Sequence, residues 1–189
     1  IGLEAYLTPR THRSERKRVQ FGDGTGDDVA SKGAYTHMTM WAEDNVGLHN
    51  LFRLSSLASI EGFYRAPRFD RELLDTYGKG LIGTTGCPSG EVNRWLQAGK
   101  YDRALAAAAD FQDILGKDNY FCEVMDHGID IERRFRDDLL RIAKTLNLPF
   151  LATNDTHYVQ PDDWKMHDAF LCVGTKSLLA DDKRFRFDS

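Results

Sequence analysis

The chain has 189 residues, which fits one folded domain with a sizeable hydrophobic core. Its formal net charge of -4 gives no global basic field for nucleic acid, and no apolar run approaches the ~20 residues that span a bilayer. Its three cysteines show no disulfide spacing and fit a reducing cytoplasm, where we expect the protein to act.

The first predicted strand covers residues 1–7, with Glu4 in its middle. Because the chain opens inside this strand and without a start methionine, we expect a fragment of a longer protein. A polar segment follows over 8–34. It carries a basic run and then acidic residues: Arg10, Arg13, Arg16, Lys17, Arg18, Asp23, Asp27 and Asp28. This composition is more typical of a solvated, mobile loop, with a phosphate-binding arm as the alternative.

Strands and helices then alternate along the chain. Short apolar, β-branched or aromatic runs predict strands over 35–42, 80–85, 119–125 and 150–152. Apolar residues at helical spacing predict helices over about 45–61, 70–77, 88–96, 102–115, 130–146 and 163–173. Repeated strand–helix alternation is typical of parallel strands joined by right-handed crossovers, so we expect an α/β fold with a parallel sheet.

Side chains that can bind metal lie on or just after different predicted strands. They are Glu4, His37, Cys87, Asp155 and His157. The ends of parallel strands converge in a barrel, and zinc accepts carboxylate, imidazole and thiolate ligands together. Residues two apart on an extended segment face the same way, as Asp155 and His157 would. Taken alone, Asp155 fits a turn or helix cap equally well, and His157 a hydrogen-bonded core histidine.

Cys87 precedes Pro88, which suits the first turn of a helix. At the N-cap of that helix, free N–H groups and the dipole would favour a thiolate, with a small buried hydrophobe as the alternative. Cys122 and Cys172 are predicted to be core residues. Among the histidines, His127 is predicted to border the site. The others are not predicted to bind metal: His12, His49 and His167.

Five segments resemble, in order, the polymerase and histidinol phosphatase (PHP) domain, in the form that stands near the N-terminus of actinobacterial-type DNA polymerase III alpha subunits. They are 1–6, 35–39, 84–91, 123–128 and 152–158. The resemblance implies a distorted, TIM-like (βα)7 barrel over residues 1–175, incomplete because its first strands are missing. Residues 176–189 would begin the connection to the polymerase palm.

The resemblance also implies a metal-dependent 3′–5′ exonuclease that acts on the primer 3′ end of DNA within a DNA-directed DNA polymerase. Glu4 and Asp155 would be catalytic, and the ligands of a divalent metal cluster would be Glu4, His37, Cys87, Asp155 and His157. Zn²⁺ is the expected metal, with Mn²⁺ or Mg²⁺ as alternatives. The other ligands, a His-x-His pair, an Asp and a His, would precede Ile1, so the fragment alone is expected to be marginally stable and inactive.

The expected partners are the rest of the alpha chain, the sliding clamp and other replisome subunits, with no membrane. Two alternatives remain open. Instead of an exonuclease, the domain would be a catalytically silent structural module that stabilises the polymerase, or a stand-alone PHP phosphoesterase.

Overall fold

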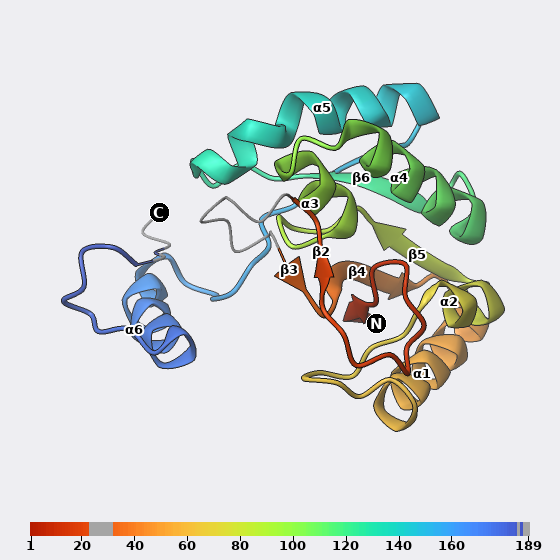
Figure 1. Ribbon diagram of the computed structural model, residues 1–189, viewed down its shortest axis with the longest axis horizontal. Coiled ribbons are helices and arrows are strands. Elements are labelled where there is room, and N and C mark those ends of the chain that lie inside the picture. Colours follow the sequence, from red (N-terminus) through yellow and green to blue (C-terminus); the bar gives the residue numbers. More distant parts are fainter. Residues whose placement is uncertain (23–31, 185, 187–189) are drawn as a thin grey trace. The chain divides into compact units, whose positions relative to one another are not determined.

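The computed structural model describes residues 1–22, 32–184 and 186 (Figure 1). These residues divide into two compact units, Ile1–Ala152 and Thr153–Ser189. The acidic residues of the predicted loop, Asp23, Asp27 and Asp28, lie outside the described part. Within the described part, no helix is both long and apolar enough to cross a membrane.

The first unit contains β1 (Gly2–Leu7), β2 (Val19–Gln20), β3 (Lys32–Gly33), β4 (Thr36–Ala42), α1 (Asn45–Ile60), α2 (Arg71–Tyr77), β5 (Leu81–Thr84), α3 (Glu91–Gln97), α4 (Tyr101–Leu115), β6 (Tyr120–Val124), α5 (Asp130–Leu146) and β7 (Phe150–Ala152). The second contains a 3₁₀ turn, η2 (Pro161–Asp163), and α6 (Trp164–Thr175). Most bounds match the predicted elements to within one or two residues. The short β2–β3 pair was not predicted, and α3 begins three residues after Pro88.

The main sheet has five strands in the order β1-β4-β5-β6-β7. β5, β6 and β7 are parallel, as predicted, but β4 runs antiparallel to both of its neighbours. The prediction of an all-parallel sheet is therefore wrong at β4. The reason is that two helices, α1 and α2, separate β4 from β5 and return the chain to the edge where β4 ended. There the Glu43 N–H donates to the Gly80 carbonyl at 2.9 Å.

In the described residues the sheet is open, with β1 and β7 at its edges, so a closed (βα)7 barrel is not confirmed. Helix α4 packs on β5 and β6, α5 packs on β6, and α3 packs against α4 and α5. Helix α1 packs on β4 and β5, and α2 packs against α1 and α4 (Figure 1). The fold that the described part does show is an α/β arrangement around a mixed sheet.

Alternate residues of β1 and β4 are buried in the hydrophobic core. They are Ala5, Leu7, Met38 and Met40. Because successive side chains on a strand point to opposite faces, Glu4, Tyr6 and His37 face away from that core. The period of two that buries the apolar residues thus places the predicted ligands of both strands on one face of the sheet.

Arg68 fastens the basic segment to this core. Its side chain is 0% exposed and donates to four backbone carbonyls. These belong to Gly62, Ala34, Arg13 and Glu15, at 2.9–3.1 Å. A guanidinium satisfied by carbonyls of three separate stretches fixes their mutual positions.

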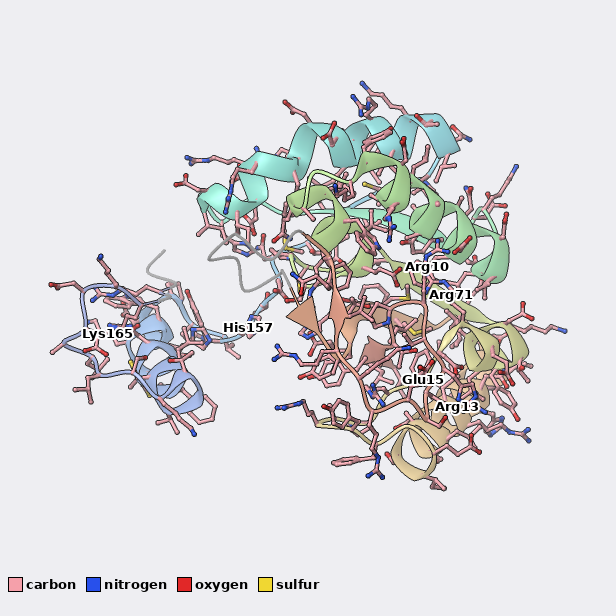
Figure 2. All side chains as sticks on the ribbon, viewed as in Figure 1. Arg10, Arg13, Glu15, Arg71, His157 and Lys165 are labelled. Carbon is pink, nitrogen blue, oxygen red and sulfur yellow. The ribbon has the colours of Figure 1, made fainter. Side chains whose placement is uncertain are left out.

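Two arginines of the basic segment are also paired. Arg13 donates to both carboxylate oxygens of Asp70 at 3.2 Å, and Arg10 donates to Asp110 at 2.8 Å. Figure 2 shows Arg10 next to Arg71, which binds the buried Glu91. The prediction of a solvated segment therefore holds for the exposed Arg16, Lys17 and Arg18, whereas Arg10 and Arg13 are held by ion pairs that it did not foresee.

Candidate metal centre

The sheet topology brings several predicted site residues to one edge. Since β4 is antiparallel to both β1 and β5, β1 runs in the same direction as β5, β6 and β7. Cys87 follows the carboxyl end of β5, and His127 follows that of β6. His37 lies at the start of β4, directly opposite Tyr6 near the end of β1. The carboxyl edge of a parallel sheet is where α/β proteins place their ligands.

At this edge Glu4, His37 and Cys87 form a cluster whose ligand atoms all lie within 4.8 Å of one another. The His37 Nδ1 atom is 2.8 Å from Glu4 Oε1 and 3.7 Å from Cys87 Sγ. Zinc bonds of about 2.0–2.3 Å leave neighbouring ligand atoms roughly 3–4 Å apart around one ion. The cluster therefore fits a divalent metal, and its thiol favours zinc over magnesium.

His37 would bind through Nδ1, because this atom faces both other ligands. Nδ1–H donates to Glu4, so a metal held at this atom would take the place of that proton. The backbone of His37 is held as well, since its N–H donates to the Ser89 carbonyl at 3.1 Å beside a bridge to Gly90. The imidazole thus enters the cluster from a fixed position.

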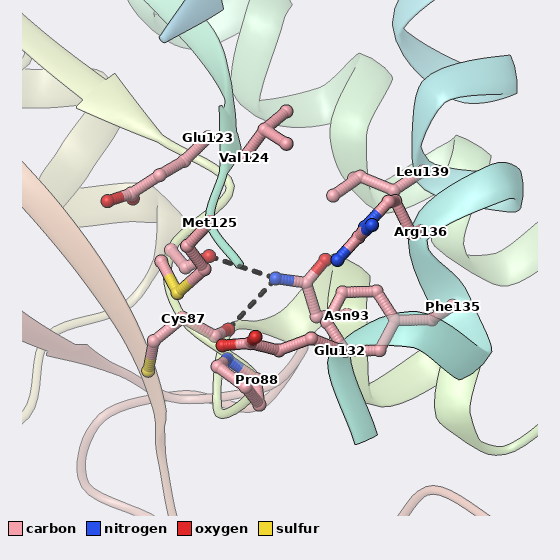
Figure 3. A pocket seen from close by; sticks show the side chains of 11 residues that line it. Cys87, Pro88, Asn93, Glu123, Val124, Met125, Glu132, Phe135, Arg136 and Leu139 are labelled. Carbon is pink, nitrogen blue, oxygen red and sulfur yellow. Dashed lines mark hydrogen bonds between the residues drawn. The ribbon is translucent and has the colours of Figure 1, made fainter. Parts of the chain in front are cut away.

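Cys87 lies in a tight turn between β5 and α3. The turn begins at Gly86, whose φ of +77° favours glycine, and it packs so closely that a Cβ at Gly90 would overlap the Thr85 carbonyl. The buried Asn93, 1% exposed, donates from Nδ2 to the carbonyls of Gly86 and Cys87, both at 2.9 Å (Figure 3). The amide of one asparagine therefore sets the path of the cysteine-bearing turn.

The prediction that Cys87 caps the following helix is wrong. The N-cap of α3 is Gly90, and the helix begins at Glu91. Instead, the Cys87 carbonyl accepts from the Gly90 N–H at 2.8 Å. Cys87 therefore stands outside the first turn of α3, and the argument from free helix N–H groups does not apply to its thiol.

Two tyrosines stack beside the cluster. The rings of Tyr6 and Tyr35 have centroids 4.5 Å apart, and both rings also contact His37. Burial raises the pKa of Tyr6, and the neighbouring Glu4, to which its hydroxyl hydrogen-bonds, raises that pKa further. Tyr6 therefore stays protonated and orients the Glu4 carboxylate.

Asp155 and His157 do not follow the predicted extended geometry. β7 ends at Ala152, and Asp155 has a left-handed backbone with a φ of +42°. His157 Nδ1–H donates to the Asp155 carbonyl, and its ring contacts that of His167. The structure thus brings Glu4, His37 and Cys87 together, whereas the pair lies in the second compact unit, where its role as ligands stays a prediction.

His127 is held by a partner that the sequence analysis missed. Glu132, in the first turn of α5, accepts from His127 Nδ1 at 2.7 Å and from the His127 backbone N–H at 2.8 Å. Glu132 is buried and lines a small cavity together with Cys87 and Pro88 (Figure 3). The sequence did contain a signal for this pair, because Glu132 follows His127 by five positions and stands at the start of a predicted helix.

The remaining predicted core and surface residues are where the sequence placed them. Cys122 and Cys172 are buried, and burial raises the pKa of Cys122 to about 12. His49 is exposed on α1. These residues carry no ligand role in the described part of the chain.

A second group of potential ligands, His12, Asp70 and Glu72, is an ion-pair cluster. Arg13 binds Asp70, whose carboxylate also caps α2 by accepting from the Leu73 N–H. The His12 Nδ1 atom accepts from the Ser14 N–H, so its Nε2 atom carries the proton in the neutral ring. The Asp70 carboxylate therefore already accepts hydrogen bonds from Arg13 and from the Leu73 N–H.

Known proteins are similar to this chain over most or all of its length. Residues 1–127 match the family model described as "PHP domain". The chain is 52% identical over its full length to the DNA polymerase III subunit alpha of Saccharopolyspora erythraea and to that of Mycobacterium tuberculosis strain H37Rv. It is 40% identical, over 99% of its length, to that of Deinococcus radiodurans. The chain spans only 13–16% of these relatives. By these matches, the chain belongs to the PHP domain family.

Proposed function

We propose that the chain is the PHP part of a bacterial DNA polymerase III alpha subunit and that it acts there as a metal-dependent 3′–5′ exonuclease. The observation that carries the proposal is the convergence of Glu4, His37 and Cys87 within 4.8 Å at one sheet edge. The high identity to actinobacterial alpha subunits supports the replicative setting. Residues 1–175 would form the domain, and 176–189 would lead toward the palm.

The donor set indicates what each residue would do. His37 Nδ1 and the Cys87 thiolate would hold a divalent ion, and Glu4 has two oxygens that can be shared between ions. Tyr6 would keep the Glu4 carboxylate oriented through its hydroxyl. A divalent metal at such a site lowers the pKa of bound water and neutralises charge on a phosphate. Asp155 and His157 would complete the ligand set, with Asp155 and Glu4 as the catalytic carboxylates.

The substrate would be the primer 3′ end, and the remainder of the alpha chain, the sliding clamp and other replisome subunits would be partners in the bacterial cytoplasm. The intact protein would then use this site to remove misincorporated nucleotides. A purely structural domain, whose metal only stabilises the fold, would leave no such activity.

The test uses the full-length protein that carries these residues. Glu4→Gln and Asp155→Asn should reduce chelator-sensitive 3′–5′ hydrolysis to background while primer extension persists, because each removes a carboxylate that the reaction needs. His49→Gln, an exposed histidine on α1, is the control and should leave both activities unchanged. Unchanged hydrolysis in both carboxylate variants would refute the proposed exonuclease.

The zinc content of two variants distinguishes a cysteine that binds the metal from a cysteine that only fills the core. Cys87→Ala should lower the zinc content per molecule, whereas Cys172→Ala should not, since Cys172 is buried in α6. Equal zinc content in the two variants would show that Cys87 is a core residue and not a metal ligand.

A further inference from the structure

His127 and Glu132 form a hydrogen-bonded pair that has no role in the proposed reaction so far. Glu132 is 3% exposed, and its carboxylate accepts from His127 Nδ1 at 2.7 Å and from the His127 backbone N–H at 2.8 Å. Nδ1 carries a proton here, because a carboxylate only accepts hydrogen bonds. Two bonds to one residue fix both the backbone and the ring of His127, and Nε2 is then the ring atom that can act on a substrate.

The charge of Glu132 favours a ring that is protonated at both nitrogens. Burying a carboxylate is costly unless an opposite charge accompanies it. Among the described residues, the one ionic partner of Glu132 is His127. A second proton on the ring, at Nε2, makes the pair neutral overall, so this contact stabilises the imidazolium form of His127.

The other charged groups next to His127 cancel in pairs. The carboxylate of Asp126 lies 3.0 Å from the guanidinium of Arg136. On the other side, Arg133 pairs with Asp130 at 3.8 Å. These pairs add little net charge at the ring, so the buried carboxylate decides which form of the ring is favoured.

The pair lies beside the Cys87 turn. β5 and β6 are parallel neighbours, so Cys87 and His127, each three residues after the end of its strand, leave the sheet at the same edge. Glu132 lines one small cavity together with Cys87 and Pro88 (Figure 3). The buried Glu123 also lines this cavity, and its negative charge acts in the same direction as that of Glu132. The side chain of His127 is 15% exposed, so solvent reaches it.

We propose that His127 is the proton donor of this site and that Glu132 is the positioning residue that holds it. Water attacks the phosphorus atom of a DNA phosphodiester and loses a proton to solvent, and the bond between phosphorus and the O3′ atom of the preceding nucleotide breaks. The leaving O3′ takes the proton from His127 Nε2. The ring, still bound to Glu132 through Nδ1, regains that proton from solvent. The reaction itself rests on the proposed exonuclease function.

The test gives the full-length protein two substrates that differ in their need for this proton. A DNA primer releases an alkoxide, which must be protonated, whereas the p-nitrophenyl ester of thymidine 5′-monophosphate releases nitrophenolate, which leaves without a proton. His127→Gln should lower primer hydrolysis by roughly 100-fold or more, the usual contribution of a general acid, and leave ester hydrolysis at the wild-type rate. His49→Gln, an exposed histidine on α1, is the matched control and should change neither rate. Equal losses on both substrates would overturn the proposal, and so would unchanged hydrolysis of the primer.

The dependence of the two rates on pH is a second measurement. Primer hydrolysis by the wild type should fall as rising pH removes the Nε2 proton of His127, whereas ester hydrolysis should not fall with it. In Glu132→Gln the fall should begin at a lower pH, because glutamine accepts from Nδ1–H without a negative charge. If His127→Gln does not fold, the wild type decides, and pH profiles of the same shape for both substrates overturn the proposal.

Chemical modification measures the pair without any hydrolysis. Diethyl pyrocarbonate acylates neutral imidazole rings, and mass spectrometry of the digested protein locates the acylated histidine. In chelator, His127 should become reactive at a higher pH in the wild type than in Glu132→Gln. Reactivity at the same pH in both proteins would refute the role of Glu132. The zinc content of His127→Gln should equal that of the wild type, and a lower content would make His127 a metal ligand and overturn its role as proton donor.

The failure of this proposal differs from the failure of the exonuclease. If the wild type hydrolyses neither substrate, the exonuclease is refuted, and with it the step in which His127 acts. If the wild type hydrolyses both and His127→Gln loses both equally, the exonuclease stands and only the proton donor is refuted.

Discussion

Removing the amide of Asn93 should loosen the Cys87 turn and weaken the metal site. In Asn93→Ala the carbonyls of Gly86 and Cys87 both lose a donor at 2.9 Å. Cys87 retains the bond from the Gly90 N–H, at 2.8 Å, so the Gly86 carbonyl bears most of the loss. The effect should therefore appear at the turn itself rather than throughout α3.

The magnitude follows from the number of bonds. Each of the two hydrogen bonds makes a net contribution of about 1 kcal/mol to stability. A buried carbonyl left without a donor costs about 1–3 kcal/mol. The Asn93 Oδ1 atom is buried and accepts no bond from the described residues, so its removal offsets part of that cost. We expect a net loss of about 2–3 kcal/mol, a large fraction of a total stability of about 5–15 kcal/mol.

The assay compares zinc affinity, by competition with a chromophoric chelator, with the free energy of unfolding. Second-layer residues that hold metal ligands typically contribute about 10–100-fold in affinity, and we expect Asn93→Ala to fall in that range. Gln112→Ala is the matched control. It removes an amide that donates to the Leu146 carbonyl at 3.0 Å, away from the turn, and should leave zinc affinity unchanged. Equal zinc affinities for the two variants would refute the reasoning.

Two further predictions concern Tyr6 and Arg68. Since burial and Glu4 raise the pKa of Tyr6, its ionisation should not affect stability below pH ~10 and should destabilise the fold as pH rises through its folded pKa. An ultraviolet titration should accordingly lose a late-ionising tyrosine in Tyr6→Phe; loss of an early one would contradict this. Arg68→Ala should cost more than about 4 kcal/mol in urea unfolding, because four carbonyls lose a charged donor. Arg65→Ala, an exposed neighbour, should change stability by less than about 0.5 kcal/mol, and similar losses in both variants would show that Arg68 is not the anchor.

The local pattern of the sequence was enough to locate the elements and part of the site. The sequence predicted the strands that carry Glu4 and His37, and the structure shows these side chains on the face opposite Met38 and Met40. The position of Cys87 after a buried strand likewise predicted its place at the sheet edge. These features depend on neighbours within a few residues, which is the range over which a periodicity can be recognised.

Other features depended on contacts between distant segments. Alternation predicted parallel strands, but the direction of β4 is decided by where α1 and α2 return the chain, at Gly80. The start of α3 is decided by close packing of Gly90 against Thr85, which moves Cys87 out of the helix. Helix propensities and capping signals depend on nearby residues only, so they do not report steric contacts between distant segments.

The sequence by itself thus determined which residue types reach the site, because side-chain chemistry and strand periodicity are local properties. The tertiary structure decided how they meet. It paired His37 Nδ1 with Glu4, set Glu132 against His127, and gave Asp155 a left-handed backbone. The physical reason is that hydrogen bonds and burial between distant segments depend on the three-dimensional path of the chain, which no local pattern specifies.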